Sequence, residues 1–164
     1  MTPSNPVVVR LSDAQMVEVR TEAIRRRENA IQQRRLNHNR TPMSANQMQQ
    51  IEMIGVLGEA AVAEWTGLPW TGRMGGHYNP AIRDVDPYEV KTSSGIKDLW
   101  IRGTTQDMRP PSQVYIKAIV VAYNTVELIG WTTLGYVVDN AEYRRKQDCY
   151  VLPAHELQPM ETLP

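Results

Sequence analysis

An almost wholly apolar run at 114–123 constrains the fold of this chain more than any other segment. A run of this length fits a central β-strand that is covered on both faces. Asn124 and Thr125 then form a tight turn into another apolar segment at 126–131, and the two segments are expected to pair as an antiparallel hairpin. The chain is therefore expected to contain a sheet that other elements cover.

Two helices are predicted before this hairpin, at about 13–38 and 45–65. Ser12 and Ser44 are suited to cap them, because a serine hydroxyl accepts from the backbone N–H groups at a helix start. The second helix has a broad apolar face, and Gly67 follows it as a stop signal. The first helix has a thin apolar stripe, and most of its surface is expected to face water. The stripe consists of Val17, Ile24, Ile31 and Leu36.

Shorter elements are predicted around the hairpin. Strands are expected at 82–92 and 99–102. A short helix at 132–140 and an edge strand at 149–152 follow the hairpin, and Pro153 opens a last helical turn. Two helices followed by a sheet with short helices indicate an α+β fold.

The composition is that of an ordinary globular protein with a single domain. The chain has 164 residues, of which 41% are hydrophobic and 22% charged, and its net charge is zero. One cysteine, Cys149, excludes a disulfide framework and a multi-cysteine zinc site. No apolar run approaches the roughly 20 residues that span a membrane, and the N-terminus lacks a signal-peptide pattern. A cytoplasmic protein without membrane contact is therefore expected.

The segment 84–91, Asp-Val-Asp-Pro-Tyr-Glu-Val-Lys, carries the most informative pattern. Side chains two residues apart in a strand point the same way, so Glu89 and Lys91 share one face while Tyr88 and Val90 take the other. Taken alone, an acid and a lysine on one face form a surface ion pair worth about 0–1 kcal/mol.

Two aspartates just upstream, Asp84 and Asp86, favour a functional interpretation. Carboxylates that converge repel each other unless a cation lies between them. Mg²⁺ takes oxygen ligands and keeps several waters, one of which can be activated to attack a phosphodiester. Lys91 is suited to orient that water or to neutralise the phosphate.

Asp84 followed by Glu89-Val90-Lys91 resembles the D…(D/E)xK signature of the PD-(D/E)XK nuclease superfamily. Members often add a glutamate from the preceding helix, and Glu59, within the small-residue stretch 55–63, is similar to that acid. Helical spacing agrees, because the neighbours of Glu59 three and four residues away are glycine, valine and alanine. An acid in such a face contacts something other than bulk water.

The resemblance is to small phage-type nucleases and covers about 51–163. It implies a restriction-endonuclease-like core at 45–164, with a central mixed sheet flanked by helices, after an arm and long basic helix at 1–44. It further implies Mg²⁺-dependent hydrolysis of DNA, with Mn²⁺ as a substitute, by a homo-oligomer (a dimer or higher) in the cytoplasm, that of the host if the protein is phage-encoded. The implied catalytic residues are Glu59, Asp84, Glu89 and Lys91, of which the three acids hold the metal.

One departure from the family pattern leaves the aspartate open. No proline precedes Asp84; the proline follows Asp86. In a regular strand neither aspartate shares a face with Glu89, because both separations are odd. A bulge near Pro87 would correct the parity, and we prefer Asp84 because the longer spacing leaves room for the bend.

Arginine supplies the candidate phosphate contacts. Arginines outnumber lysines 14 to 4, and half of them lie between Arg20 and Arg40. Their fork-shaped guanidinium groups suit phosphate, although such a helix is also consistent with a solvated face that pairs with Glu18, Glu22 and Glu28. Thr92 and Ser93, whose hydroxyl groups follow Lys91, could hydrogen-bond a phosphate or could instead begin a turn. The predicted nucleic-acid contacts are Arg25, Arg26, Arg34, Arg35, Arg102, Thr92 and Ser93.

The leading hypothesis is therefore a metal-dependent DNA nuclease. One alternative is a DNA-binding or assembly protein that keeps this scaffold without catalysis. Another is that the resemblance is false and the acids are surface pairs. The pattern separates neither duplex from other DNA substrates, nor DNA from RNA.

Overall fold

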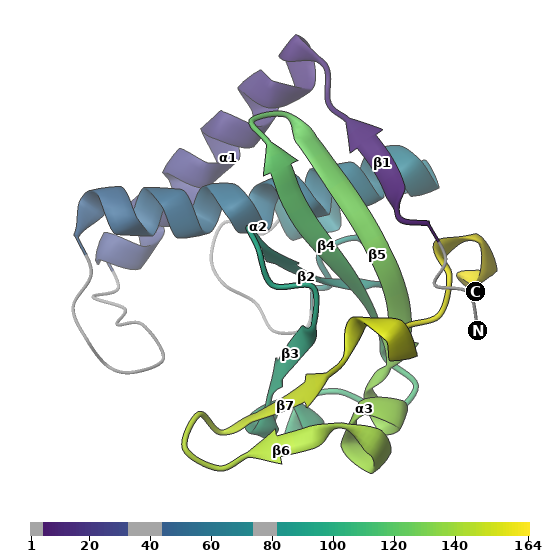
Figure 1. Cartoon of the computed structure of the whole chain (residues 1–164). Coiled ribbons are helices and arrows are strands. Elements are labelled where there is room, and N and C mark those ends of the chain that lie inside the picture. Colours follow the sequence, from purple (N-terminus) through teal and green to yellow (C-terminus); the bar gives the residue numbers. More distant parts are fainter. Residues whose placement is uncertain (1–4, 33–43, 74–81) are drawn as a thin grey trace.

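Two crossed helices pack on a four-stranded sheet in the computed structural model, which describes residues 5–32, 44–73 and 82–164 (Figure 1). A three-stranded sheet lies below the large sheet in this view. The predicted α+β class is confirmed. Within the described residues, no helix is both long enough and apolar enough to cross a membrane.

Both helices start where their sequences predict, and the second also ends there; the predicted end of the first, at 38, lies outside the described residues. Ser12 Oγ and Ser44 Oγ each accept from the backbone N–H three residues further on, at 3.2 Å, and each serine N–H donates back to a glutamine side chain. Gly67 ends the second helix in the left-handed conformation, with φ at 71°. The helices are α1 (Asp13–Gln32) and α2 (Ala45–Thr66).

The large sheet is mixed, in the order β1-β5-β4-β2. Strands β4 and β5 form the predicted antiparallel hairpin, and β2 lies parallel to β4 at one edge. Strand β1 was not predicted, because four residues are too few to show a period and its partner, β5, lies far along the chain. The strands are β1 (Val7–Arg10), β2 (Glu89–Ser93), β4 (Val114–Ala122) and β5 (Thr125–Thr133).

The small sheet is antiparallel, in the order β3-β7-β6. The predicted edge position of β7 is wrong, since β3 and β6 pair with its two sides. The exposed, polar β6 has no apolar period that would predict it. Its strands are β3 (Leu99–Arg102), β6 (Glu142–Arg144) and β7 (Cys149–Leu152). The shorter helices are α3 (Leu134–Asn140) and the 3₁₀ turns η1 (Thr71–Arg73), η2 (Gly103–Asp107), η3 (Ala154–Glu156) and η4 (Met160–Thr162).

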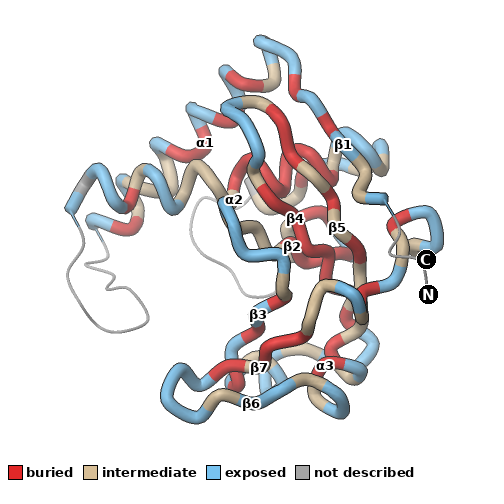
Figure 2. Tube along the Cα trace, viewed as in Figure 1, coloured by how far each residue is buried: buried red, intermediate tan, exposed pale blue. Residues whose placement is uncertain are grey.

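The predicted apolar stripe of α1 faces outward, contrary to expectation. Val17, Ile24 and Ile31 are 59%, 42% and 48% exposed, while Leu36 and the rest of 33–38 lie outside the described residues. Figure 2 shows buried positions recurring among exposed ones along α1. Alanines on the buried face allow α1 to lie close to α2, and its single buried acid is paired with two arginines. The buried residues of α1 are Met16, Val19, Glu22, Ala23 and Ala30.

The strand predicted at 82–92 begins only at Glu89. Val85 and Tyr88 close a turn through two backbone hydrogen bonds, of 3.1 and 2.7 Å, around a cis Asp86–Pro87 peptide. Proline has no N–H for a sheet ladder, so the turn takes the place of the strand's first half.

A close approach of α2 to β2 predicts that alanine substitutions at two neighbouring glycines change the free energy of unfolding in opposite directions. A Cβ on Gly58 would lie 1.8 Å from Thr92 Oγ1, whereas a Cβ on Gly55 meets nothing within 4 Å. We expect Gly58→Ala to lower the free energy of unfolding by about 1–3 kcal/mol through overpacking. Gly55→Ala should raise it by about 0.5–1 kcal/mol through helix propensity. Urea unfolding measures both, and equal effects at the two sites would contradict the close approach.

Candidate active site

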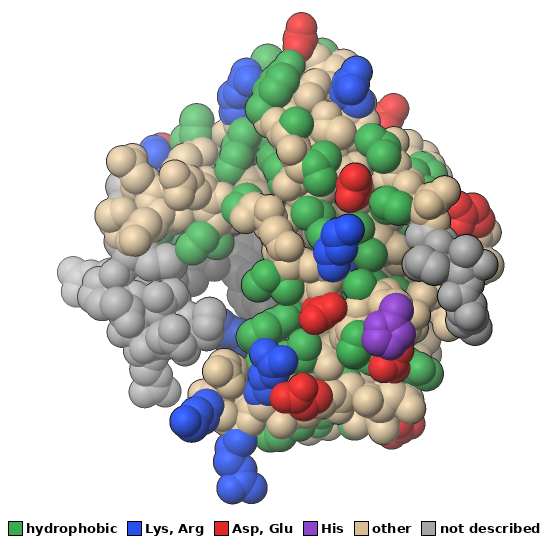
Figure 3. All heavy atoms as spheres, viewed as in Figure 1, with side chains coloured by type: hydrophobic (Ala, Val, Ile, Leu, Met, Phe, Trp, Pro, Cys, Tyr) green, Lys and Arg blue, Asp and Glu red, His purple; other side chains and the backbone are tan. Residues whose placement is uncertain are grey.

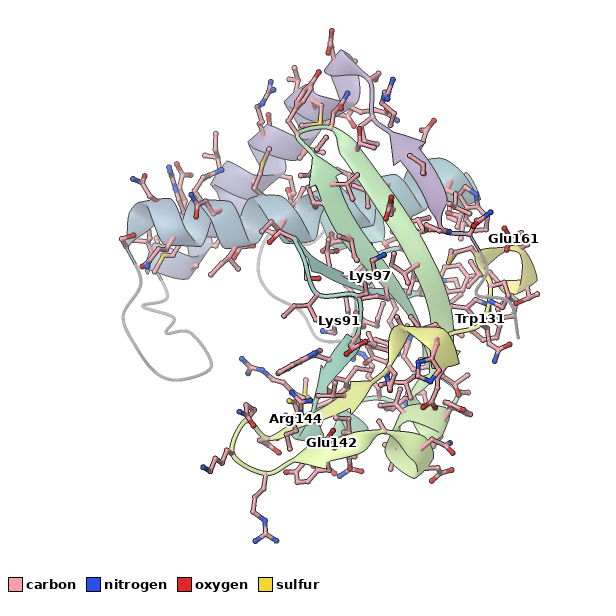
Figure 4. The ribbon with its side chains drawn as sticks, viewed as in Figure 1. Lys91, Lys97, Trp131, Glu142, Arg144 and Glu161 are labelled. Carbon is pink, nitrogen blue, oxygen red and sulfur yellow. The ribbon has the colours of Figure 1, made fainter. Side chains whose placement is uncertain are left out.

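Strand β2 places Glu89 and Lys91 on one face, as predicted, and this face is the one opposite α2. Glu89 lies opposite Tyr115 in the parallel register, and paired residues in parallel strands point to the same face. Thr92 points the other way, against Gly58 of α2. Lys91 lies below β2 in Figure 4, on the side of the small sheet, with its ammonium 6.0 Å from the centre of the Tyr115 ring.

The turn before β2 brings Asp84, and not Asp86, to Glu89. Asp84 Oδ2 accepts from the backbone N–H of Val90 at 2.8 Å, and its carboxyl group hydrogen-bonds that of Glu89. Asp86 is exposed, and its backbone N–H donates to Thr71 Oγ1 at 2.8 Å. Burial first, and then the charge of Glu89, raise the pKa of Asp84 to about 6. Asp84 is an odd number of residues from Glu89 and would not share its face in a regular strand. The turn, and not a bulge within the strand, brings the two carboxyl groups together.

Glu59 meets Asp84 from the helix side. It is only 5% exposed, and Gly72 lies between the two acids: a Cβ there would be 3.0 Å from Glu59 Oε2 and 3.1 Å from Asp84 Cα. Both oxygens of Glu59 accept from Arg26, at 2.8 and 2.6 Å, and Oε2 also accepts from Trp70 Nε1 at 2.8 Å. Burial and then the charge of Asp84 raise the pKa of Glu59 to about 7, although Arg26 opposes the shift.

A second arginine, Arg109, neutralises Glu89. Its Nε and Nη2 both lie close to Glu89 Oε1, at 2.8 and 2.7 Å, and the side chain is 11% exposed. Arg83 Nε lies 4.0 Å from the same oxygen. Glu59, Asp84 and Glu89 thus form an acidic group in which a guanidinium pairs with each of the two outer members, Glu59 and Glu89.

Lys117 is a further cation on the face of Lys91, which it opposes in the register. It is 3% exposed, and its ammonium donates to Ser93 Oγ at 2.8 Å. Burial lowers the pKa of Lys117 to about 8. Ser93 Oγ in turn donates to the carbonyl oxygen of Ile96, so this predicted phosphate contact is already hydrogen-bonded. Thr92, the other, faces away from the acids.

The arginines of α1 divide between outside and inside. Arg25 pairs with Glu22 at 2.5 Å. Arg26 donates to Glu22 at 2.9 Å and, as described, to Glu59. Its guanidinium is therefore occupied by two acids and is not an exposed phosphate contact of the kind predicted. Arg102, at the end of β3, is exposed. The predicted contacts that lie outside the described residues are Arg34 and Arg35.

Several residues of the site carried no signal in the strand pattern. They come from loops and from the neighbouring strand, and tertiary packing brings them to the acids. The clearest hint is the glycine-rich composition before the acidic strand, where a glycine allows two acids to approach. The residues missed are Trp70, Gly72, Arg83, Arg109 and Tyr115.

Three of the predicted residues converge closely, and the fourth adjoins them. Asp84 and Glu89 are in contact, Lys91 shares the face of Glu89, and Glu59 lies across Gly72 from Asp84. Over 5–32, 44–73 and 82–164, no three Asp, Glu, His or Cys side chains are grouped to hold a metal by themselves. Comparisons with protein families, curated proteins and solved structures found no match.

The raised pKa of Asp84 predicts how stability depends on pH in metal-free protein. The folded state binds this proton more tightly than the unfolded state does. The stabilisation is therefore complete below pH 4 and is lost as the pH rises to about 6. Asp84→Asn stays neutral and keeps an acceptor for Val90, so it should be more stable than wild type at pH 8 by about 1–3 kcal/mol and similar at pH 4.

Urea unfolding at the two pH values in EDTA measures this difference. Asp86→Asn is the matched control, because its side chain is exposed, and should change little. A gain of the same size at both pH values would show that the carboxyl charge is not its origin.

Proposed function

We propose that this chain is a metal-dependent nuclease that hydrolyses DNA phosphodiester bonds, with a restriction-endonuclease-like core of the PD-(D/E)XK kind. The observation that carries the proposal is the meeting of Asp84, Glu89 and Lys91 at one edge of a mixed sheet. The adjoining helix contributes Glu59, which is the order and placement that the family signature implies.

The acid pair has the chemistry of a cation site. Burial first, and then the charge of the adjacent Glu89, raise the pKa of Asp84, so the ionised pair is unfavourable without a cation. Mg²⁺, or Mn²⁺ in its place, would relieve this repulsion and would supply an activated water and charge stabilisation at the phosphate. Asp84 and Glu89 would hold it, and Glu59 would complete or orient its ligand shell, since Arg26 already takes up much of Glu59's charge.

Lys91 and Tyr115 have distinct roles in this proposal. Lys91 would orient the attacking water or neutralise the phosphate, because it shares the face of Glu89 and is two residues along the same strand. The Tyr115 ring lies beneath its ammonium. Burial and the charge of Glu89 raise the pKa of Tyr115, so its phenol stays a neutral hydrogen-bond donor at the site.

Basic residues outside the acid pair would hold the DNA backbone. Figure 3 shows basic side chains over the turn between β6 and β7, where Arg144, Arg145 and Lys146 follow one another. Arg25 and Arg102 would add contacts, with Arg34 and Arg35 further along the basic segment. A homo-oligomer in the cytoplasm, that of the host for a phage protein, is the setting that the family resemblance implies.

A DNA-binding or assembly protein without catalysis is the second candidate. The observation in its favour is that guanidinium groups occupy two of the three acids, Glu59 and Glu89. In such a protein these ion pairs would be permanent structural links.

Plasmid cleavage with Mg²⁺ separates the two candidates. We expect cleavage by wild type and a loss of about 10²–10⁴-fold in Lys91→Ala, as for removal of a group that assists proton transfer. Lys97→Ala is the matched control, since this lysine is exposed on the loop after β2 (Figure 4) and should leave the rate unchanged.

Calorimetric titration with Mn²⁺ tests the cation site independently of cleavage. Wild type should bind Mn²⁺, and Glu89→Ala should lose most of this affinity. Binding without cleavage would favour the second candidate, and equal cleavage by wild type and Lys91→Ala would refute the assigned role of the lysine.

A further inference from the structure

The guanidinium of Arg109 uses only part of its hydrogen-bonding capacity in the ion pair with Glu89. Two of its nitrogens converge on one oxygen, Glu89 Oε1, instead of spanning both oxygens as a fork. Among the described residues, the contact of the third nitrogen, Nη1, is a long one of 3.4 Å with the carbonyl oxygen of Met108. This arrangement leaves N–H donors that an anion presenting two oxygens can take.

Glu89 does not depend on Arg109 alone for neutralisation. Arg83 Nε is 4.0 Å from the same oxygen. A buried acid that loses its only partner is strongly destabilised, and this second guanidinium reduces that cost. Departure of Arg109 is therefore compatible with the fold.

The backbone of Arg109 is anchored on an exposed loop. Its N–H donates to Thr105 O at 3.0 Å at the end of η2, and two prolines follow it. The residues at 106–108 and 110–112 are exposed around it. The loop thus fixes the backbone position from which the Arg109 side chain reaches Glu89.

We propose that Arg109 is a substrate contact that rests on Glu89 in the free protein and binds a DNA backbone phosphate in the complex. The inference rests on the proposed nuclease function and adds a residue to it. A guanidinium pairs better with a phosphate than with a single carboxylate oxygen, because it can donate two parallel N–H bonds to two phosphate oxygens. A cation that binds Glu89 would weaken the resting ion pair and so favour the phosphate contact.

The salt dependence of DNA binding tests this contact without cleavage. Anisotropy of a fluorescein-labelled 20-base-pair duplex is measured in EDTA over a KCl series. Arg109→Gln should weaken binding about tenfold and reduce the slope of log K against log[KCl] by about 0.9, the value for one lost phosphate contact. Arg109→Lys keeps the charge and should retain the slope. Arg10→Gln, at an exposed position at the end of β1 to which no DNA contact is assigned, is the matched control and should change neither affinity nor slope.

A double-mutant cycle with Glu89→Gln separates a phosphate contact from simple neutralisation of Glu89. Glu89→Gln alone should tighten DNA binding, because it frees Arg109 and removes a negative charge. If Arg109 contacts phosphate, adding Arg109→Gln to this background again lowers the slope by about 0.9. If Arg109 only neutralises Glu89, Arg109→Gln has no effect in this background, and the inference is overturned.

Failure of the inference is distinguishable from failure of the proposed function. Wild type that binds and cleaves DNA while Arg109→Gln keeps its affinity and slope overturns the inference alone. Wild type that neither binds nor cleaves DNA overturns both. Thermal unfolding of each variant identifies loss of folding, and Arg109→Lys gives the required comparison if Arg109→Gln does not fold.

Discussion

The buried carboxylate of Glu59 is the interaction on which the arrangement of this site depends. It lies on α2, yet it is held by Arg26 of α1 and Trp70 of the following loop, and it faces Asp84 across Gly72. An ionised acid cannot remain buried without such partners. The same ion pair therefore fixes α1 on α2, closes the loop over the helix and sets the distance to the turn before β2.

The rest of the site follows the same electrostatic logic. Three acids lie in sequence from α2 to β2, and a guanidinium neutralises the first and the last of them. The middle acid, Asp84, accepts the backbone N–H of Val90, while burial first and then the charge of Glu89 raise its pKa. A cation placed here would complete the neutralisation, and the proposed metal site rests on this argument.

Local chemistry was predictable wherever it depends on neighbours along the chain. Ser12, Ser44 and Gly67 cap their helices because capping needs only the nearest turn. The β4–β5 hairpin follows from its apolar run. The outward turn of the α1 stripe was not predictable, because its buried face is defined by α2, and alanine fits there where isoleucine does not. Strand β1 was missed because its partner is more than a hundred residues away.

The sequence by itself determined the α+β order, the caps, the hairpin and the shared face of Glu89 and Lys91, because periods of two and 3.6 residues dictate them. Only the tertiary structure decided between Asp84 and Asp86 as the neighbour of Glu89. The alternation of side chains applies to a regular strand, and a hydrogen-bonded turn replaces the strand before Glu89. The tertiary structure also recruited Arg26 and Arg109, which no local pattern connects to the acids. Burial is the physical reason, because charges removed from water must find partners wherever the fold supplies them.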